Sequence, residues 1–95
     1  MRRHQRIRIQ NVRIAASAQR HHFDSATGIP FLCECDDELC HDFVVLPLRT
    51  FERALRDGDV LVADGHGVDG AERAAPADGY TLVHLAQNPA HGAGA

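Results

Sequence analysis

The sequence Phe31-Leu32-Cys33-Glu34-Cys35-Asp36-Asp37-Glu38-Leu39-Cys40-His41 contains all three cysteines of this 95-residue chain within eight positions. An odd number of cysteines cannot all pair as disulfides, and clustered thiols in a reducing compartment bind metal more often than they pair. We therefore expect Cys33, Cys35 and Cys40 to bind one metal ion with a histidine as fourth ligand: Zn²⁺, with iron as the alternative. The competing interpretation is three buried, unreactive cysteines, which clustering among acidic residues disfavours.

The spacing of the cysteines differs from that of common zinc fingers. One residue separates Cys33 from Cys35, and four separate Cys35 from Cys40, so the usual two-residue spacing is absent. In an extended strand, residues 33 and 35 point to the same face, which lets both sulfurs approach one ion. The turn that follows would return Cys40 as the third ligand of a zinc-finger-like Cys3His site. We interpret the neighbouring acids as solvated rather than as a hard-cation site: Glu34, Asp36, Asp37 and Glu38.

Three histidines compete for the fourth ligand position. His66 is the first choice, because it follows an apolar strand and the two flanking glycines let the backbone orient its imidazole. His41 is the second choice, because a residue directly after Cys40 has difficulty reaching the same ion. His84 is the third, because a histidine on a strand face more often has a structural role.

The charge is distributed unevenly along the chain, although the net charge is only −3. All thirteen acidic residues lie at or after Asp24, where only four arginines accompany them. The N-terminal arm (residues 1–23) is therefore basic and the remainder acidic. The arm could contact nucleic acid or an acidic partner, or it could pack against its own acidic body. The candidate partner-contacting residues are Arg2, Arg3, Arg6, Arg8 and Arg13.

The first half of the chain predicts one helix followed by two short strands. Residues 4–22 lack proline and glycine and carry a helical apolar period, although residues 6–10 also alternate as a strand would. A turn-rich link covers residues 24–30. Residues 31–33 and 42–46 read as short strands on either side of the cysteines.

A second, amphipathic helix is predicted to begin at Pro47 and to end at Asp57-Gly58. Its core-facing stripe is expected to contain Leu48, Phe51 and Leu55. Beyond it the sequence predicts a strand, a long loop with room for one helical turn, a final strand and a disordered tail. These segments are, in order, residues 60–63, 68–79 (helical turn at 71–74), 80–86 and 87–95.

Together these elements predict a small single domain of the α+β class, with short antiparallel strands around one amphipathic helix and a zinc staple. Its expected parts are the arm (residues 1–23), a zinc-binding body (24–86) and the tail (87–95). No apolar run is long enough to span a bilayer, and no hydrophobic region follows the basic start as in a secretion signal. We expect a cytoplasmic protein that does not bind membranes.

Several of these residues resemble an uncharacterised family of small bacterial proteins. The shared features are a Phe-x-Cys-Glu-Cys-x4-Cys stretch beginning at Phe31, an amphipathic helix carrying Phe51, a Gly-His turn at His66 and a closing strand after Asp-Gly-Tyr. By this resemblance, which spans roughly residues 31–85, the ligand-like positions are Cys33, Cys35, Cys40 and His66. Asp64 stands where the family usually has proline, and the arm matches weakly. The resemblance implies no established activity.

Three function classes are compatible with this sequence. The first is a non-enzymatic, zinc-stabilised module that binds another macromolecule, most simply a protein, because no phosphate loop, hydrolase triad or metalloprotease histidine pair is present. The second is a nucleic-acid-binding regulator that uses the arginine-rich arm. The third is a zinc enzyme with an open coordination position and Glu34 or Glu38 as general base. The oligomeric state does not follow from the sequence.

Overall fold

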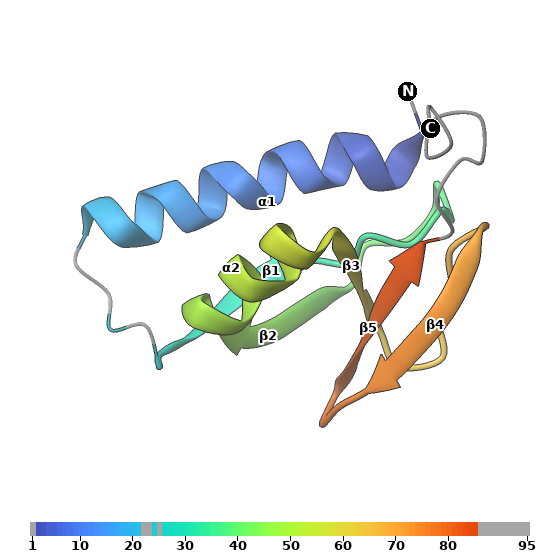
Figure 1. Ribbon diagram of the computed structural model, residues 1–95. Helices are drawn as coiled ribbons and strands as arrows, with labels where there is room; N and C mark the ends of the chain where they lie inside the picture. The colour runs from blue at the N-terminus through green and yellow to red at the C-terminus, as the bar shows by residue number, and fades with distance from the viewer. Residues whose placement is uncertain (1, 22–23, 25, 86–95) are drawn as a thin grey trace, which may run out of the picture.

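Two helices and two antiparallel sheets make up the part of the chain that the computed structural model describes, residues 2–21, 24 and 26–85 (Figure 1). This arrangement confirms the predicted α+β class. In chain order the elements are α1 (Arg3–Arg20), β1 (Gly28–Leu32), β2 (Phe43–Pro47), α2 (Leu48–Asp57), β3 (Asp59–Ala63), β4 (Ala71–Pro76) and β5 (Tyr80–Leu85). The predicted tail, residues 87–95, lies outside the described residues.

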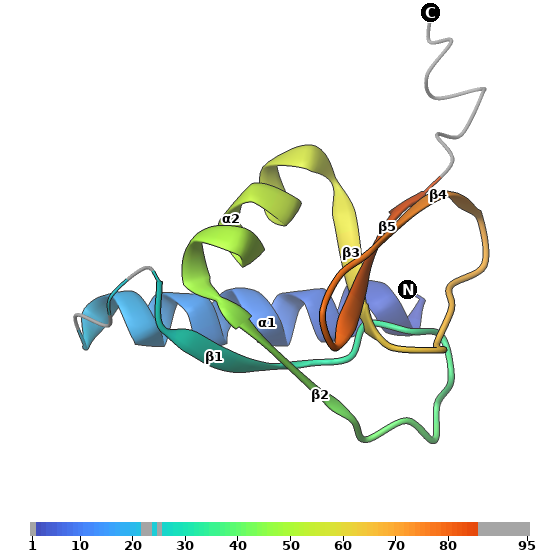
Figure 2. The same ribbon diagram turned by 90° about the horizontal axis from the view of Figure 1, so that it is seen from below.

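The first sheet pairs β1 with β2 and turns one face toward both helices (Figure 2). Residues facing inward pair across the strands, as Phe31 does with Val44, and are almost fully buried. Phe31 also stacks on Phe51 of α2, with ring centroids 4.4 Å apart. Two stacked aromatic rings bury a large apolar area and therefore fix the position of α2 on the sheet.

Helix α2 has the predicted ends but a shifted core face. Pro47 precedes its first turn, and Gly58 ends it in the left-handed conformation with φ of 75°. The prediction of Leu55 as a core residue is wrong, because its side chain is 42 % exposed. Ala54 is buried in its place, 1 % exposed. A small residue at this position lets the helix approach the core closely.

The second sheet has the strand order β3-β5-β4, with both pairs antiparallel. Strand β4 occupies residues predicted as loop with a helical turn, so that prediction is wrong. Every residue of β4 is exposed, and its alanines favour helix in isolation, so no alternating pattern marks the strand. Its backbone pairing with β5 therefore outweighs local propensity.

Strand β1 begins at Gly28 instead of Phe31 and includes Pro30. A proline is tolerated because β1 has a single sheet neighbour, so one side of the strand carries no ladder hydrogen bonds. The strand ends at Leu32, so the cysteine loop (residues 33–42) starts with Cys33 directly after it.

Helix α1 confirms the predicted N-terminal helix and begins at Arg3. The Gln5 side chain accepts a 2.8 Å hydrogen bond from the backbone N–H of Arg2, which caps the first turn. Figure 1 shows α1 running along the fold with its N-terminal end beside the cysteine loop. No helix among the described residues is long and apolar enough to cross a membrane.

Candidate metal centre

The structure brings Cys33, Cys35, Cys40 and His66 together at one point. The three cysteines come from the cysteine loop between β1 and β2, and His66 from the loop after β3. Their ligand-type atoms all lie within 4.8 Å of one another. All three cysteines are free and buried, and the His66 side chain is 29 % exposed. This grouping joins the two sheets through side chains.

Two of the distances within this cluster match those of a tetrahedral zinc site. Nδ1 of His66 lies 3.5 Å from Sγ of Cys33 and 3.5 Å from Sγ of Cys40. Tetrahedral zinc, with bonds of about 2.3 Å to sulfur and about 2.0–2.1 Å to nitrogen, holds a sulfur and a nitrogen about 3.5–3.6 Å apart. The donor set of three thiols and one imidazole therefore fits one Zn²⁺.

Backbone hydrogen bonds fix the path of the chain at Cys33 and Glu34. The N–H of Cys33 donates to the carbonyl of Asp42, beside β2, at 3.0 Å, whereas the N–H of Glu34 donates to the carbonyl of Leu61 in β3 at 2.8 Å. The chain therefore changes its hydrogen-bonding partner from the segment beside β2, at Cys33, to β3, at Glu34. In addition, the N–H of Ala63 donates to Sγ of Cys33 at 3.2 Å.

A tight turn returns Cys40 to the site. Its backbone N–H donates to the carbonyl of Asp37 at 3.0 Å, and the Asp37 carboxylate accepts a 2.9 Å hydrogen bond from the N–H of Leu39. Aspartate commonly closes such turns by bonding its side chain to the backbone two residues on. The acidic residues between Cys35 and Cys40 thus include one that builds the turn.

His66 is oriented from both sides. The preceding Gly65 has φ of 80°, a left-handed conformation that glycine adopts without strain, and the N–H of His66 donates to the carbonyl of Ala63 at 3.0 Å. Nε2 of the ring lies 3.1 Å from a carboxylate oxygen of Asp42. Such a contact holds Nδ1 toward the sulfurs, as carboxylates do for metal-bound histidines.

The other two histidines considered for the fourth position lie elsewhere. His41 is exposed and does not belong to the cluster. His84 lies on β5, where its Nδ1 is 2.7 Å from the carboxylate of Asp59 on the neighbouring strand. The structure therefore brings only His66, of these three, to the thiols.

Burial favours the protonated form of two of the thiols, those of Cys33 and Cys35, in the absence of a cation. It raises the pKa of Cys33 to about 12, although hydrogen bonds from the backbone of Ala63 and Cys35 act in the opposite direction. Burial likewise raises the pKa of Cys35. A divalent cation at this position would favour the thiolate form instead, because a coordinating thiol loses its proton.

Glu34 is fully buried, so the prediction that it is solvated is wrong. Arg8 of α1 donates two 2.8 Å hydrogen bonds to its carboxylate, one to each oxygen. Asn11 donates a third bond at 2.8 Å, and the N–H of Leu61 a fourth at 2.9 Å. This network connects α1, the cysteine loop and β3. Sequence reasoning missed it, although Asn11 lies on the apolar stripe of the helix.

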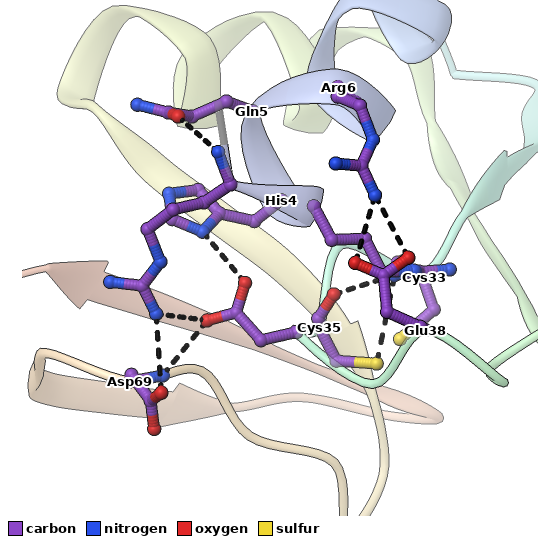
Figure 3. Close-up of polar contacts among 10 residues, drawn as sticks. His4, Gln5, Arg6, Cys33, Cys35, Glu38 and Asp69 are labelled. Atoms are coloured by element: carbon purple, nitrogen blue, oxygen red, sulfur yellow. Dashed lines mark hydrogen bonds and ion pairs between the residues drawn. The ribbon is translucent and has the colours of Figure 1, made fainter.

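Four of the five predicted partner-contacting arginines bind the chain itself. The guanidinium of Arg3 donates to backbone carbonyls of the cysteine loop, and Arg8 pairs with Glu34. Arg6 pairs with the exposed Glu38 at 2.9 Å (Figure 3). Arg2 pairs with Asp36 at 2.5 Å. Arg13 is exposed, with no ion pair among the described residues.

The carboxylate of Asp36 interacts with residues of α1 and of the loop before β4. Besides the ion pair with Arg2, it lies 3.1 Å from Nδ1 of His4 and accepts a 3.2 Å bond from the N–H of Asp69. Partial burial by itself would raise the pKa of Asp36, but these hydrogen bonds and the nearby positive charge lower it overall. The first turn of α1 and the loop before β4 are thus both attached to the cysteine loop, as Figure 3 shows for His4 and Asp69.

Comparison with known proteins does not identify this centre. No family model matches the chain, and no curated protein or solved structure is significantly similar to it. The resemblance to the small bacterial proteins with a Cys-Glu-Cys stretch therefore stays a prediction. What supports the centre is its donor set and its geometry.

Proposed function

We propose that the chain binds one Zn²⁺ through Cys33, Cys35, Cys40 and His66, and that this ion holds the fold of a non-enzymatic protein-interaction module. The observation that carries the proposal is the convergence of four soft or borderline ligands within 4.8 Å of one another, with the His66 nitrogen 3.5 Å from two of the sulfurs. Because thiols must stay reduced to bind metal, the protein belongs in the cytoplasm. Zinc is preferred over iron, because a closed tetrahedral site with a histidine is typical of structural zinc.

The surroundings of the site support a structural ion over a catalytic one. Four protein ligands fill a tetrahedron and leave no position for a water molecule. The two acids considered as general bases form ion pairs with arginines: Glu34 with the partly buried Arg8, and Glu38 with Arg6 on the surface. Neither carboxylate is therefore placed to activate a metal-bound water.

A protein partner is supported by the outer face of the β1–β2 sheet. Phe43 and Val45 alternate with buried residues of β2 and remain 63 % and 61 % exposed. Leu39, in the cysteine loop just before β2, is 83 % exposed. Large apolar side chains on a sheet face are typical of a surface that another protein covers. The engagement of Arg2, Arg3, Arg6 and Arg8 within the chain disfavours nucleic acid as the partner.

The metal part of the proposal is tested by elemental analysis of protein purified without a metal-binding tag. We expect one zinc per chain, lost in His66→Ala and in Cys35→Ser and retained in His41→Ala, which serves as the matched control. Iron in place of zinc would be visible as thiolate-to-iron absorption. A stably folded protein without any bound metal would contradict the proposal, since structural zinc contributes directly to folding.

The partner part is tested by placing the photo-crosslinking amino acid benzoylphenylalanine at residue 45 in living cells. The control carries the same group at residue 53, which is exposed on α2. The expected result is an adduct at residue 45 alone, sensitive to protease and lost when Phe43→Glu is added. A nuclease-sensitive adduct would favour the nucleic-acid alternative instead, and equal adducts at both positions would refute this surface.

A further inference from the structure

One arginine is bonded to all three cysteines of the proposed site. Arg3, the first residue of α1, is 9 % exposed, and its guanidinium enters the cysteine loop. Its Nη1 donates to the carbonyls of Cys33 and Cys35 at 3.1 and 2.6 Å. Its Nη2 donates to the carbonyl of Cys40 at 2.8 Å. A planar guanidinium with several fixed donors can bridge three carbonyls in this way, whereas a lysine ammonium cannot reproduce the fork.

The same guanidinium lies beside the sulfur cluster. Nη1 of Arg3 is 3.9 Å from Sγ of Cys35. Three thiolates and one Zn²⁺ leave a buried net charge of about −1, which is costly to hold away from water without a compensating positive charge. A fixed cation at this distance offsets that charge. The N–H that Ala63 donates to Sγ of Cys33 acts in the same direction.

We infer that Arg3 is a positioning residue of the metal centre, which aligns the backbone of the cysteine loop and neutralises the negative charge of the zinc–thiolate cluster. The inference rests on the proposed zinc binding. It has a structural consequence for the helix, because Arg3 forms part of the first turn of α1. Zinc binding therefore favours docking of this turn, and docking of the turn strengthens zinc binding in return.

The two contributions of Arg3 can be separated by substitution. Arg3→Lys keeps the positive charge but loses the bridge between three carbonyls, whereas Arg3→Met removes both. Arg13→Met is the matched control, because it removes the same charge from an exposed position of the same helix. Charge loss should make the zinc-bound thiolates more nucleophilic, whereas loss of the bridge alone should weaken zinc binding without that effect.

The experiment measures three properties of each variant. Zinc stoichiometry comes from elemental analysis, zinc affinity from competition with a chromophoric chelator, and thiolate reactivity from the rate at which iodoacetamide alkylates the zinc-loaded protein. The wild-type stoichiometry tests the proposed function by itself. If it is one zinc per chain, the variants test Arg3.

For Arg3→Met we expect one zinc per chain and alkylation several-fold faster than in the wild type. Its zinc affinity should be about 10–100-fold lower, as is typical when a group that supports a metal ligand is removed. Arg3→Lys should lose affinity but react with iodoacetamide at nearly the wild-type rate, and Arg13→Met should match the wild type in both. Should Arg3→Met fail to fold, Arg3→Lys supplies the test through the same two measurements. Wild-type affinity in Arg3→Lys, or wild-type reactivity in a folded Arg3→Met, would overturn the inference.

Discussion

Replacing Arg8 by methionine should destabilise the protein much more than the loss of a surface arginine would. The Arg8 side chain is 17 % exposed and Glu34 is not exposed at all, and two hydrogen bonds of 2.8 Å join them. The guanidinium also donates to the carbonyl of Asp59 and lies 5.4 Å from the ring centroid of Phe51. Methionine fills most of the same volume but leaves the Glu34 carboxylate buried without a cation.

The magnitude follows from the cost of an unpaired buried charge. Removing one partner of a buried ion pair costs about 3–5 kcal/mol. Asn11 and the N–H of Leu61 still donate to the carboxylate, so we expect the lower end of that range, about 3 kcal/mol. In a domain of this size 1 kcal/mol shifts Tm by about 4–8 °C, so Tm should fall by roughly 12–24 °C.

The assay is urea unfolding of the zinc-loaded protein, followed by circular dichroism. Four variants are compared: Arg8→Met, Glu34→Gln, their combination, and Glu38→Gln as the control. The control weakens a pair whose side chains are 49 % and 68 % exposed, which should cost about 0–1 kcal/mol. The double variant should lose about 2 kcal/mol less free energy of unfolding than the two single variants lose together, because each side chain's contribution depends on the presence of the other.

Two results would refute this reasoning. The first is a loss below about 1 kcal/mol for Arg8→Met, which would put the pair in the range of exposed ion pairs. The second is full additivity of the two single substitutions, because contacting residues that depend on each other do not behave independently.

Three further predictions follow from the same geometry. Chelation of the metal should unfold the cysteine loop and leave α1 as a marginal isolated helix. The circular dichroism signal should fall on chelation and recover on adding Zn²⁺, and a spectrum unchanged by the chelator would contradict this. Zinc binding at pH 7 should release at least two protons, because burial keeps Cys33 and Cys35 protonated without metal. Zinc affinity, measured by competition titration, should therefore fall at least about 100-fold per pH unit on acidification. Gly58→Ala should cost about 1 kcal/mol in thermal melting, because φ is 75° there, whereas Gly67→Ala, whose φ lies outside the left-handed region, should cost less.

The parts of the fold that the sequence predicted are those that depend on local chemistry. Pro47 and Gly58 mark the ends of α2 because a ring-fixed φ suits a helix start and a left-handed φ suits its end. The cysteines were recognisable because clustered thiols among acids are unfavourable as core. His66 was recognisable because glycines flank it, and the structure brings it to the thiols.

The parts that were missed depend on distant neighbours. Strand β4 has a helix-favouring composition and exists through its pairing with β5. Ala54 is buried in place of the predicted Leu55, because the face of α2 that packs on the core differs from the predicted one. Neither choice can be read from a local period, since the deciding partner lies elsewhere in the sequence.

The buried polar network did leave a signal in the sequence. Asn11 stands on the same helical stripe as Ile7, Ile14 and Ala18, and a polar residue there needs a buried partner. The structure supplies it: the Asn11 amide donates to Glu34 and to the carbonyl of Leu32, and its oxygen accepts from the N–H of Leu32. The partner could not be named from sequence, because an acid between two cysteines looks solvated.

The single residue between Cys33 and Cys35 explains how one short segment takes part in both the proposed metal centre and the Glu34–Arg8 network. In an extended chain, side chains alternate, so the sulfurs of residues 33 and 35 share one side and the carboxylate of Glu34 takes the other. The sulfurs converge on His66, while the carboxylate binds Arg8 and the N–H of Leu61. With two residues between the cysteines, the side chains of an alternating chain would place the two sulfurs on opposite sides, and they could not both face His66. The Cys-Glu-Cys spacing therefore couples the proposed metal centre to the docking of α1 on β3.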